Sequence, residues 1–268
     1  MTHPILTRHH VCFAGQGQTP MLFAHGFGCD QTMWRWVAPA FAADYQVITF
    51  DYVGSGKSDL TAYDPNRYQS LQGYAQDVLA ICDTLALEKL IFVGHSVSAM
   101  IGVLAAIQAP QYFQQLILVA PSPCYINDDD YVGGFERRDI EQLLELMERN
   151  YLGWASFLAP VAMKNEDNPD LTRELEDSFC STDPEIATRF AKATFYADNR
   201  SDLPRVKIPS LILQCTEDSI APKAVGYYLQ HHLPHSTLQI MQATGHCPHM
   251  SHPEETIALM KAYLAETL

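Results

Sequence analysis

Short apolar runs alternate with amphipathic segments through the first half of the chain. The runs are rich in β-branched and aromatic residues and cover residues 21–24, 46–50, 90–93 and 116–119. Nearly continuous hydrophobicity of this kind is typical of parallel strands that are buried on both faces. The segments with apolar residues at helical spacing are 32–41, 71–85 and 99–108. Strand and helix in alternation predict a doubly wound, mostly parallel sheet.

The alternation stops after Pro123 and is replaced by helical patterns. Residues 127–199 contain no strand-like run, but they contain four helical stretches separated by Gly or Pro, at 137–151, 154–163, 170–179 and 184–196. The alternation then resumes with strands at 210–215 and 238–241 and helices at 224–231 and 254–267. We therefore expect a core made of residues 1–126 and 200–268, with residues 127–199 inserted as a helical cap.

Charge and length narrow the class of protein. A chain of 268 residues fits one large α/β domain or a core with a modest insertion. It carries 31 acidic and 17 basic side chains, a formal net charge of −14. Such a surface repels nucleic acid and anionic membranes, and no stripe of basic residues offsets the repulsion. We expect neither as a partner.

The chain has no segment typical of export or membrane insertion. No run approaches the roughly eighteen apolar residues that span a bilayer, and the first ten residues are polar, unlike a signal peptide. The seven cysteines are scattered without a C-x-x-C pair. These features predict reduced thiols in a cytoplasmic protein.

The sharpest chemical signal is a serine between a strand and a helix. Ser96 follows the run 90–93, and a nucleophilic serine on such a tight turn projects its hydroxyl at the carboxyl end of the sheet. Gly94 supplies the small residue that this turn needs, but Ser98 replaces the second glycine of the G-x-S-x-G pattern. The alternative is a structural serine in the first turn of a buried helix.

An early glycine-containing segment strengthens the nucleophile hypothesis. His25-Gly26-Phe27-Gly28 follows the first apolar run, where an oxyanion-binding loop is expected. The backbone N–H groups of Phe27 and Val97 would then face the developing oxyanion. An ordinary glycine-rich turn is the alternative.

An orienting acid and a base should follow the serine in the chain. Asp218, just after the strand at 210–215, is the expected acid, and the adjacent Glu217 is its rival. His246 follows the last strand, and an imidazole suits a base because its pKa lies near neutral pH. His249 and His252 continue at intervals of three, but no further ligands at zinc spacing accompany them, so we predict no metal and no cofactor.

A second glycine-rich segment superficially resembles a phosphate loop. Residues 51–58 include Gly54, Gly56 and Lys57, but Asp51 stands where a phosphate loop needs glycine. We expect an ordinary loop after a core strand, in which the glycines permit tight turns.

Three segments closely resemble one branch of the α/β-hydrolases. They are residues 94–102, 131–136 and 245–253, with further likeness at 191–195 and 211–215. The branch contains the bacterial stress-response regulator RsbQ, which looks most similar, and the plant receptors for karrikins and strigolactones. The likeness extends over essentially the whole chain, and Ser98 is characteristic of the branch. The resemblance implies an α/β-hydrolase fold with about eight strands and a V-shaped cap of four helices.

The resemblance also implies a site. It implies that Ser96, Asp218 and His246 form the catalytic triad, which favours Asp218 over Glu217. It implies a pocket under the cap, whose expected lining residues are His95, Phe27, Tyr125, Phe135, Trp154, Leu158, Phe195 and Ser219. For the cap aromatics, plain packing between helices is the alternative. A small apolar pocket of this kind suits a compact hydrophobic ester, lactone or butenolide enol ether.

Two functions are compatible with this site. The first is a serine hydrolase that works through a covalent intermediate and that, as the resemblance to RsbQ implies, also has a signalling role. The second, implied by the resemblance, is a ligand-sensing regulator that acts mainly by binding a protein partner, such as a phosphatase with a PAS domain, while hydrolysis is slow or incidental. A serine nucleophile argues against haloalkane dehalogenase and epoxide hydrolase chemistry, which use a carboxylate at that position.

Overall fold

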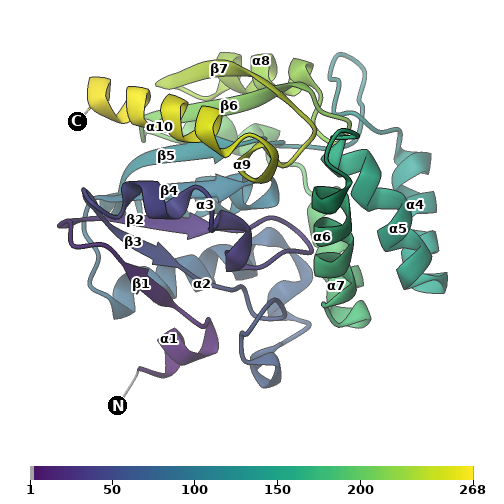
Figure 1. Cartoon of the computed structure of the whole chain (residues 1–268), viewed down its shortest axis with the longest axis horizontal. Coiled ribbons are helices and arrows are strands. Elements are labelled where there is room, and N and C mark those ends of the chain that lie inside the picture. The colour runs from purple at the N-terminus through teal and green to yellow at the C-terminus, as the bar shows by residue number, and fades with distance from the viewer. Residues whose placement is uncertain (1–2, 268) are drawn as a thin grey trace.

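A mostly parallel sheet forms the centre of the molecule (Figure 1). The computed structural model describes residues 3–267, so Met1, Thr2 and Leu268 of the predicted core ranges lie outside it. Within that part, seven strands are arranged in the order β1-β3-β2-β4-β5-β6-β7, and only the β1–β3 pair is antiparallel. The strands are β1 (Cys12–Ala14), β2 (Thr19–Ala24), β3 (Tyr45–Thr49), β4 (Leu90–His95), β5 (Phe113–Val119), β6 (Ser210–Glu217) and β7 (Ser236–Thr244). The predicted fold class is confirmed, with seven described strands where about eight were expected.

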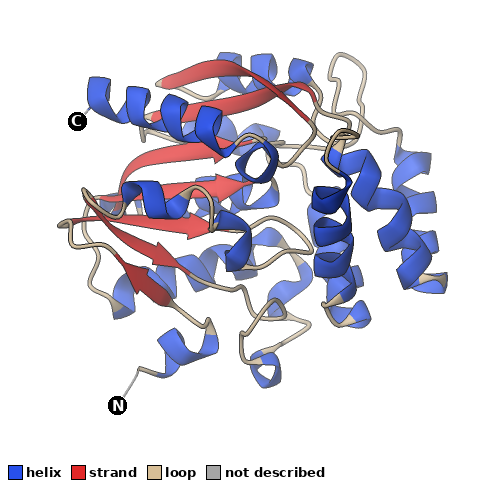
Figure 2. Cartoon of the chain, viewed as in Figure 1, coloured by secondary structure: helices blue, strands red, loops and turns tan. Residues whose placement is uncertain are grey.

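Helices cover both faces of the sheet (Figure 2). Alternate side chains of a strand point to opposite faces, so Met21 and Phe23 pack in one cluster and Leu22 and Ala24 in the other. The first cluster includes residues of α9 (Pro248–Ser251) and α10 (Pro253–Thr267), and the second includes residues of α2 (Leu71–Thr84), α3 (Val97–Gln108) and α8 (Lys223–His232). The short α1 (Pro4–Arg8) contacts α2. None of the described helices is long and apolar enough to cross a membrane.

The prediction of a single helix at residues 32–41 is wrong. Two short 3-10 helices, Gln31–Trp34 and Ala38–Phe41, occupy this segment. Pro39 has no N–H to donate to the carbonyl four residues earlier, and its ring would clash with that carbonyl in an α-helix. The chain instead closes tighter turns, such as the 3.0 Å bond from Val37 N to Trp34 O.

Four α-helices and one short 3-10 helix, Arg200–Arg205, lie between β5 and β6 in the described chain. The α-helices form one group. They are α4 (Arg137–Arg149), α5 (Tyr151–Met163), α6 (Pro169–Cys180) and α7 (Pro184–Phe195). Figure 1 shows them together at the end of the sheet to which the parallel strands point. Helix α5 begins three residues before the expected position because the Asn150 side chain caps it, accepting a 3.0 Å hydrogen bond from Gly153 N.

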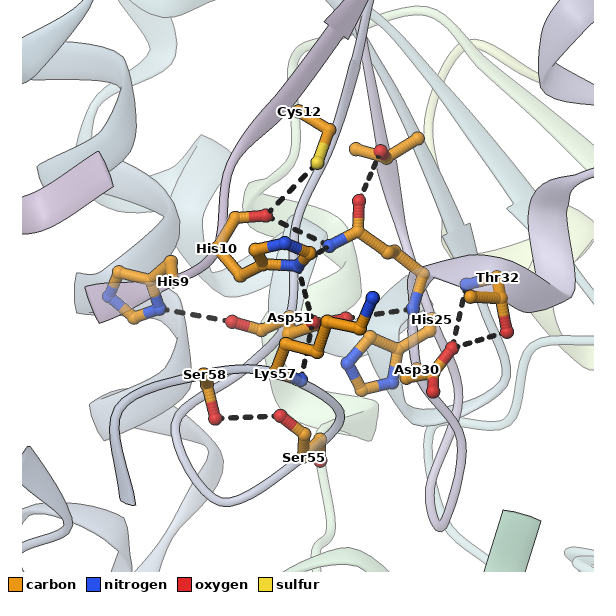
Figure 3. Close-up of polar contacts among 12 residues, drawn as sticks. His9, His10, Cys12, His25, Asp30, Thr32, Asp51, Ser55, Lys57 and Ser58 are labelled. Carbon is orange, nitrogen blue, oxygen red and sulfur yellow. Dashed lines mark hydrogen bonds and ion pairs between the residues drawn. The ribbon is translucent and has the colours of Figure 1, made fainter. Parts of the chain in front are cut away.

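Asp51 ties the loop after β3 to the loop after β2 (Figure 3). Its carboxylate accepts hydrogen bonds from the backbone N–H groups of Gln31 and Lys57, both at 2.9 Å, and lies 3.2 Å from His10 Nδ1. A Cβ on Gly56 would lie 2.6 Å from the same carboxylate. The Lys57 N–H is therefore already hydrogen-bonded to the Asp51 carboxylate. Through this carboxylate, residues 51–58 connect the loop after β3 to the loop after β2.

Candidate active site

Ser96 occupies a strained turn between β4 and α3. Its φ of 56° and ψ of −122° lie outside the regions that L-residues ordinarily adopt. A 2.8 Å hydrogen bond from Ser96 N to Val119 O holds the turn against β5. A Cβ on Gly94 would lie 2.6 Å from the backbone oxygen of Ser98, so the helix can cross the strand this closely only over a glycine.

The serine that replaces the second glycine of the turn has a structural role. The buried Ser98 hydroxyl donates a hydrogen bond to the backbone oxygen of His25 and lies 3.0 Å from the Tyr52 hydroxyl. His25 directly precedes the Gly26–Phe27 step. Ser98 therefore connects the helix that follows the candidate nucleophile to the candidate oxyanion loop.

The structure brings Ser96, His246 and Asp218 into one line of contacts. His246 Nε2 lies 2.7 Å from Ser96 Oγ, and His246 Nδ1 lies 2.7 Å from Asp218 Oδ2. The other Asp218 oxygen accepts hydrogen bonds from Ile220 N at 2.8 Å and Ala221 N at 3.0 Å. All three residues are only 5–6% exposed. The arrangement can move a proton from the hydroxyl to the imidazole and stabilise the charge that results.

Glu217 points away from this line. Its exposed carboxylate pairs with Lys164 Nζ at 2.8 Å, and this partner holds the Glu217 pKa below its usual value. The two carboxylates that the sequence offered therefore have different environments, and Asp218 is the one that contacts the imidazole.

Two further imidazoles are buried behind His246. The His95 ring lies 5.1 Å from the His246 ring, and its Nε2 lies 2.8 Å from the His246 backbone oxygen. Burial, with smaller contributions from His249 and His246, lowers the His95 pKa well below its usual value. A neutral His95 can therefore donate this hydrogen bond to the His246 carbonyl. His249 packs 4.3 Å from His95 and 4.6 Å from Trp34, between ring centroids, and burial lowers its pKa to about 3.

The two expected oxyanion donors come from different elements. Phe27 lies in the loop after β2, and Val97 is the first residue of α3. The first N–H groups of a helix have no acceptor within the helix. Neither the Phe27 nor the Val97 N–H donates a hydrogen bond within residues 3–267. Both remain able to bind an oxyanion.

A mainly apolar cavity opens at Ser96 and His246. Its lining residues are Phe27, Cys29, His95, Ser96, Tyr125, Leu158, Ala162, Leu175, Phe179, Thr194, Phe195, Ile220, His246 and Cys247. No Asp, Glu, Lys or Arg is among these described lining residues. The chemistry of the lining therefore suits a mostly hydrophobic ligand.

Five of the pocket residues expected from the sequence line this cavity: His95, Phe27, Tyr125, Leu158 and Phe195. The Tyr125 hydroxyl lies 3.3 Å from Ser96 Oγ, and burial raises the Tyr125 pKa above its usual value. The phenol therefore stays neutral and can hydrogen-bond near the reacting atoms.

Three other expected pocket residues lie outside the cavity lining. Phe135 packs behind Phe195, with ring centroids 6.3 Å apart. Trp154 is fully buried and supports Phe27, with centroids 5.9 Å apart. Ser219 is exposed because the turn that satisfies the Asp218 carboxylate directs the next residue, Ile220, inward instead.

Several lining residues were not identified from the sequence. They are Cys29, Ala162, Leu175, Phe179, Thr194, Ile220 and Cys247. Helical spacing could have indicated three of them, since Leu175 and Phe179 lie four residues apart and Ala162 lies four after Leu158. The Thr194 hydroxyl oxygen has no hydrogen-bond partner among the described residues, so it is available to a ligand. Burial raises the pKa of the Cys29 thiol to about 12 and that of Cys247 well above its usual value, so both stay protonated.

Comparison with known proteins identifies the family. The model of the Alpha/beta hydrolase family matches residues 21–259. The chain is 38% identical over 257 residues to Karrikin insensitive 2 receptor CA from Petunia hybrida, covering 96% of this chain and 95% of that protein. It is 36% identical over 263 residues to Strigolactone esterase D14 from Arabidopsis thaliana, covering 98% of each. The solved structure of olei00960, a hydrolase from Oleispira antarctica, superposes with a TM-score of 0.96 and 44% identity, covering 98% of this chain and 96% of that one. The chain belongs to the α/β-hydrolase family.

Proposed function

We propose that this chain is a serine hydrolase of the esterase type, acting on a small hydrophobic ester, lactone or butenolide enol ether. The observation that carries the proposal is the pair of 2.7 Å contacts linking Asp218, His246 and Ser96 at the opening of an apolar cavity. Similarity to proteins named as an esterase and a hydrolase supports the reaction class.

The geometry supports a two-step mechanism. His246 Nε2 removes the Ser96 proton as Oγ attacks the carbonyl carbon, and the Phe27 and Val97 amides stabilise the oxyanion. The carbon–oxygen bond to the leaving group then breaks, and His246 returns the proton to that group. Water, deprotonated by His246, hydrolyses the acyl-serine. Asp218 keeps the imidazole in the required tautomer throughout.

We further propose that residues 127–199 act as a cap on a core formed by residues 1–126 and 200–268. Leu158, Leu175 and Phe179 of α5 and α6 line the same cavity as Ser96 and His246. A cap of this kind would exclude bulk water and select the ligand by shape.

A second candidate function is ligand sensing with a protein partner. It is favoured by the 38% identity to a protein named as a receptor, and the sequence resemblance suggests a PAS-domain phosphatase as the partner. A phosphatase gene of that type beside the gene for this chain would favour sensing, whereas a group of catabolic genes would favour a plain esterase.

Turnover of a butenolide-bearing strigolactone analogue tests the proposed hydrolysis. The parent protein should release the butenolide ring, and Ser96→Ala should not. Retained release by Ser96→Ala would exclude Ser96 as the nucleophile. A parent that cleaves p-nitrophenyl acetate through Ser96 but leaves the analogue intact would keep the triad and remove the butenolide from the substrate class.

A further inference from the structure

The C-terminal turn of α5 abuts the loop that carries His246. The His246 N–H donates a 2.7 Å hydrogen bond to the Ala162 backbone oxygen. One residue earlier, Gly245 has a φ of +80°, and a Cβ there would lie 2.0 Å from the Met163 backbone oxygen. Only glycine permits this approach, so the base and the helix end are held in direct backbone contact.

Polar side chains at this junction satisfy carbonyl groups that the helix cannot. The last carbonyls of a helix have no donor within it. Asn165 Nδ2 lies 2.6 Å from the Met163 oxygen and 3.3 Å from the Thr244 oxygen, so one amide group bridges α5 and the end of β7. The Thr244 hydroxyl donates in return to the Lys164 oxygen at 3.3 Å. The Lys164–Glu217 ion pair spans the same junction, but an exposed pair of this kind contributes little.

The same helix lines the cavity. Leu158 and Ala162 are four residues apart, so they share one face of α5, and both contact the cavity. Ala162 thus lines the cavity, and its carbonyl accepts the hydrogen bond from the His246 N–H. The position of α5 and the position of His246 are therefore mechanically linked.

We propose that Asn165 is a positioning residue for His246. Its side chain holds the C-terminal turn of α5 against the end of β7, the strand that precedes His246 in the chain, and thereby fixes the position of the imidazole. The inference rests on the proposed role of His246 as the base. It assigns a function in the reaction to a side chain that does not contact the cavity.

The direct test is Asn165→Asp. The carboxylate has almost the same shape as the amide, but it cannot donate a hydrogen bond and it places negative charge between two carbonyl oxygens. We expect kcat for p-nitrophenyl acetate to fall about tenfold with KM within about twofold, because the base is misplaced while the cavity persists. The matched control is Asn168→Asp, three residues away, whose exposed side chain makes no cap hydrogen bond. It should retain the parental kcat.

A spectroscopic measurement separates positioning from general stability. The proton between His246 Nδ1 and Asp218 Oδ2 should give a downfield NMR signal in the parent. This signal should shift or broaden in Asn165→Asp at a temperature where circular dichroism matches the parent. Should Asn165→Asp fail to fold, Thr244→Val takes its place, and we expect a smaller fall in kcat, of about threefold, because this variant loses only the hydrogen bond from the Thr244 hydroxyl to the Lys164 oxygen.

The outcomes distinguish this proposal from the proposed function. Parental kcat and an unchanged downfield signal in a folded Asn165→Asp, or parental kcat in Thr244→Val when the first variant does not fold, would overturn the positioning role alone. Full turnover by Ser96→Ala would overturn the proposed function, and this inference with it.

Discussion

At the scale of single residues, burial decides the role of a side chain where residue type alone leaves two candidates. Asp218 and Glu217 are adjacent and carry the same functional group. Asp218 is buried against His246 and accepts two backbone N–H groups, whereas Glu217 is exposed and pairs with Lys164. A carboxylate held by fixed donors in a buried site can orient an imidazole, but a mobile surface carboxylate cannot.

Asp218→Asn should lower kcat by about 10⁴-fold while the protein stays folded. The amide is isosteric and keeps an oxygen for the Ile220 and Ala221 N–H groups, but it favours the wrong His246 tautomer. Steady-state kinetics with p-nitrophenyl acetate measure the effect. Glu217→Gln is the matched control and should stay within about twofold of the parent. A large loss in the control together with a small one in Asp218→Asn would make Glu217 the orienting group.

Ser98→Ala should destabilise the fold by about 1–3 kcal/mol, because it leaves the buried His25 carbonyl without its donor. The free energy of unfolding in urea measures this loss. The exposed Ser181, whose hydroxyl donates to the Ser178 oxygen, offers a control, and Ser181→Ala should change stability by less than about 0.5 kcal/mol. Equal effects of the two substitutions would show that the Ser98 hydroxyl contributes nothing specific.

At the scale of elements, caps and prolines set the boundaries that hydrophobic spacing cannot. The apolar pattern located α5, but the Asn150 cap fixed its first residue. The pattern at residues 32–41 also suited a helix, but Pro39 divided it into two short turns. Helical periodicity reports which residues face the core, and backbone hydrogen bonding decides where a helix begins and ends.

Asn150→Ala should destabilise the protein by about 1 kcal/mol, since the Gly153 N–H loses its acceptor. Asn168 holds the equivalent position before α6, but its side chain makes no cap hydrogen bond. Asn168→Ala should therefore cost less than about 0.5 kcal/mol. Thermal and urea unfolding of both variants provide the comparison, and equal losses would contradict the cap assignment.

At the scale of the whole molecule, the core contains several neutral histidines. Burial is the largest cause that lowers the pKa of His25, His95 and His249 below their ordinary value of 6.5. Below pH 6.5 the unfolded chain binds protons that the folded chain excludes. The stability contributed by these groups is therefore complete above pH 6.5 and is lost as the pH falls, for His249 down to about 3.

The free energy of unfolding should thus fall as the pH drops from about 6.5 to about 5, at up to about 1.4 kcal/mol per pH unit for each histidine kept neutral. Urea titrations across this range measure the slope. His249→Gln removes one titrating group of similar size and should make the slope shallower, whatever its effect at neutral pH. An unchanged slope would exclude His249 as a contributor.

Much of the site could be predicted because strand ends converge in a parallel sheet. Ser96, Asp218 and His246 each follow a strand, and their order in the chain is informative. The cavity lining was harder, because it depends on how α4–α7 pack. Trp154 is a large aromatic on a helix that lines the cavity, yet it supports Phe27 from behind. Ser219 follows Asp218, yet it faces solvent.

The sequence by itself determined the layered fold with its mostly parallel sheet and the residue types of the candidate site, because periodicity and turn chemistry are local properties. Tertiary structure decided which carboxylate meets His246, which aromatic side chains reach the cavity, and that the end of α5 holds the loop of the base. These outcomes depend on distances between segments far apart in the chain, such as Ala162 and His246. Such distances follow from the packing of the whole molecule, which no local pattern encodes.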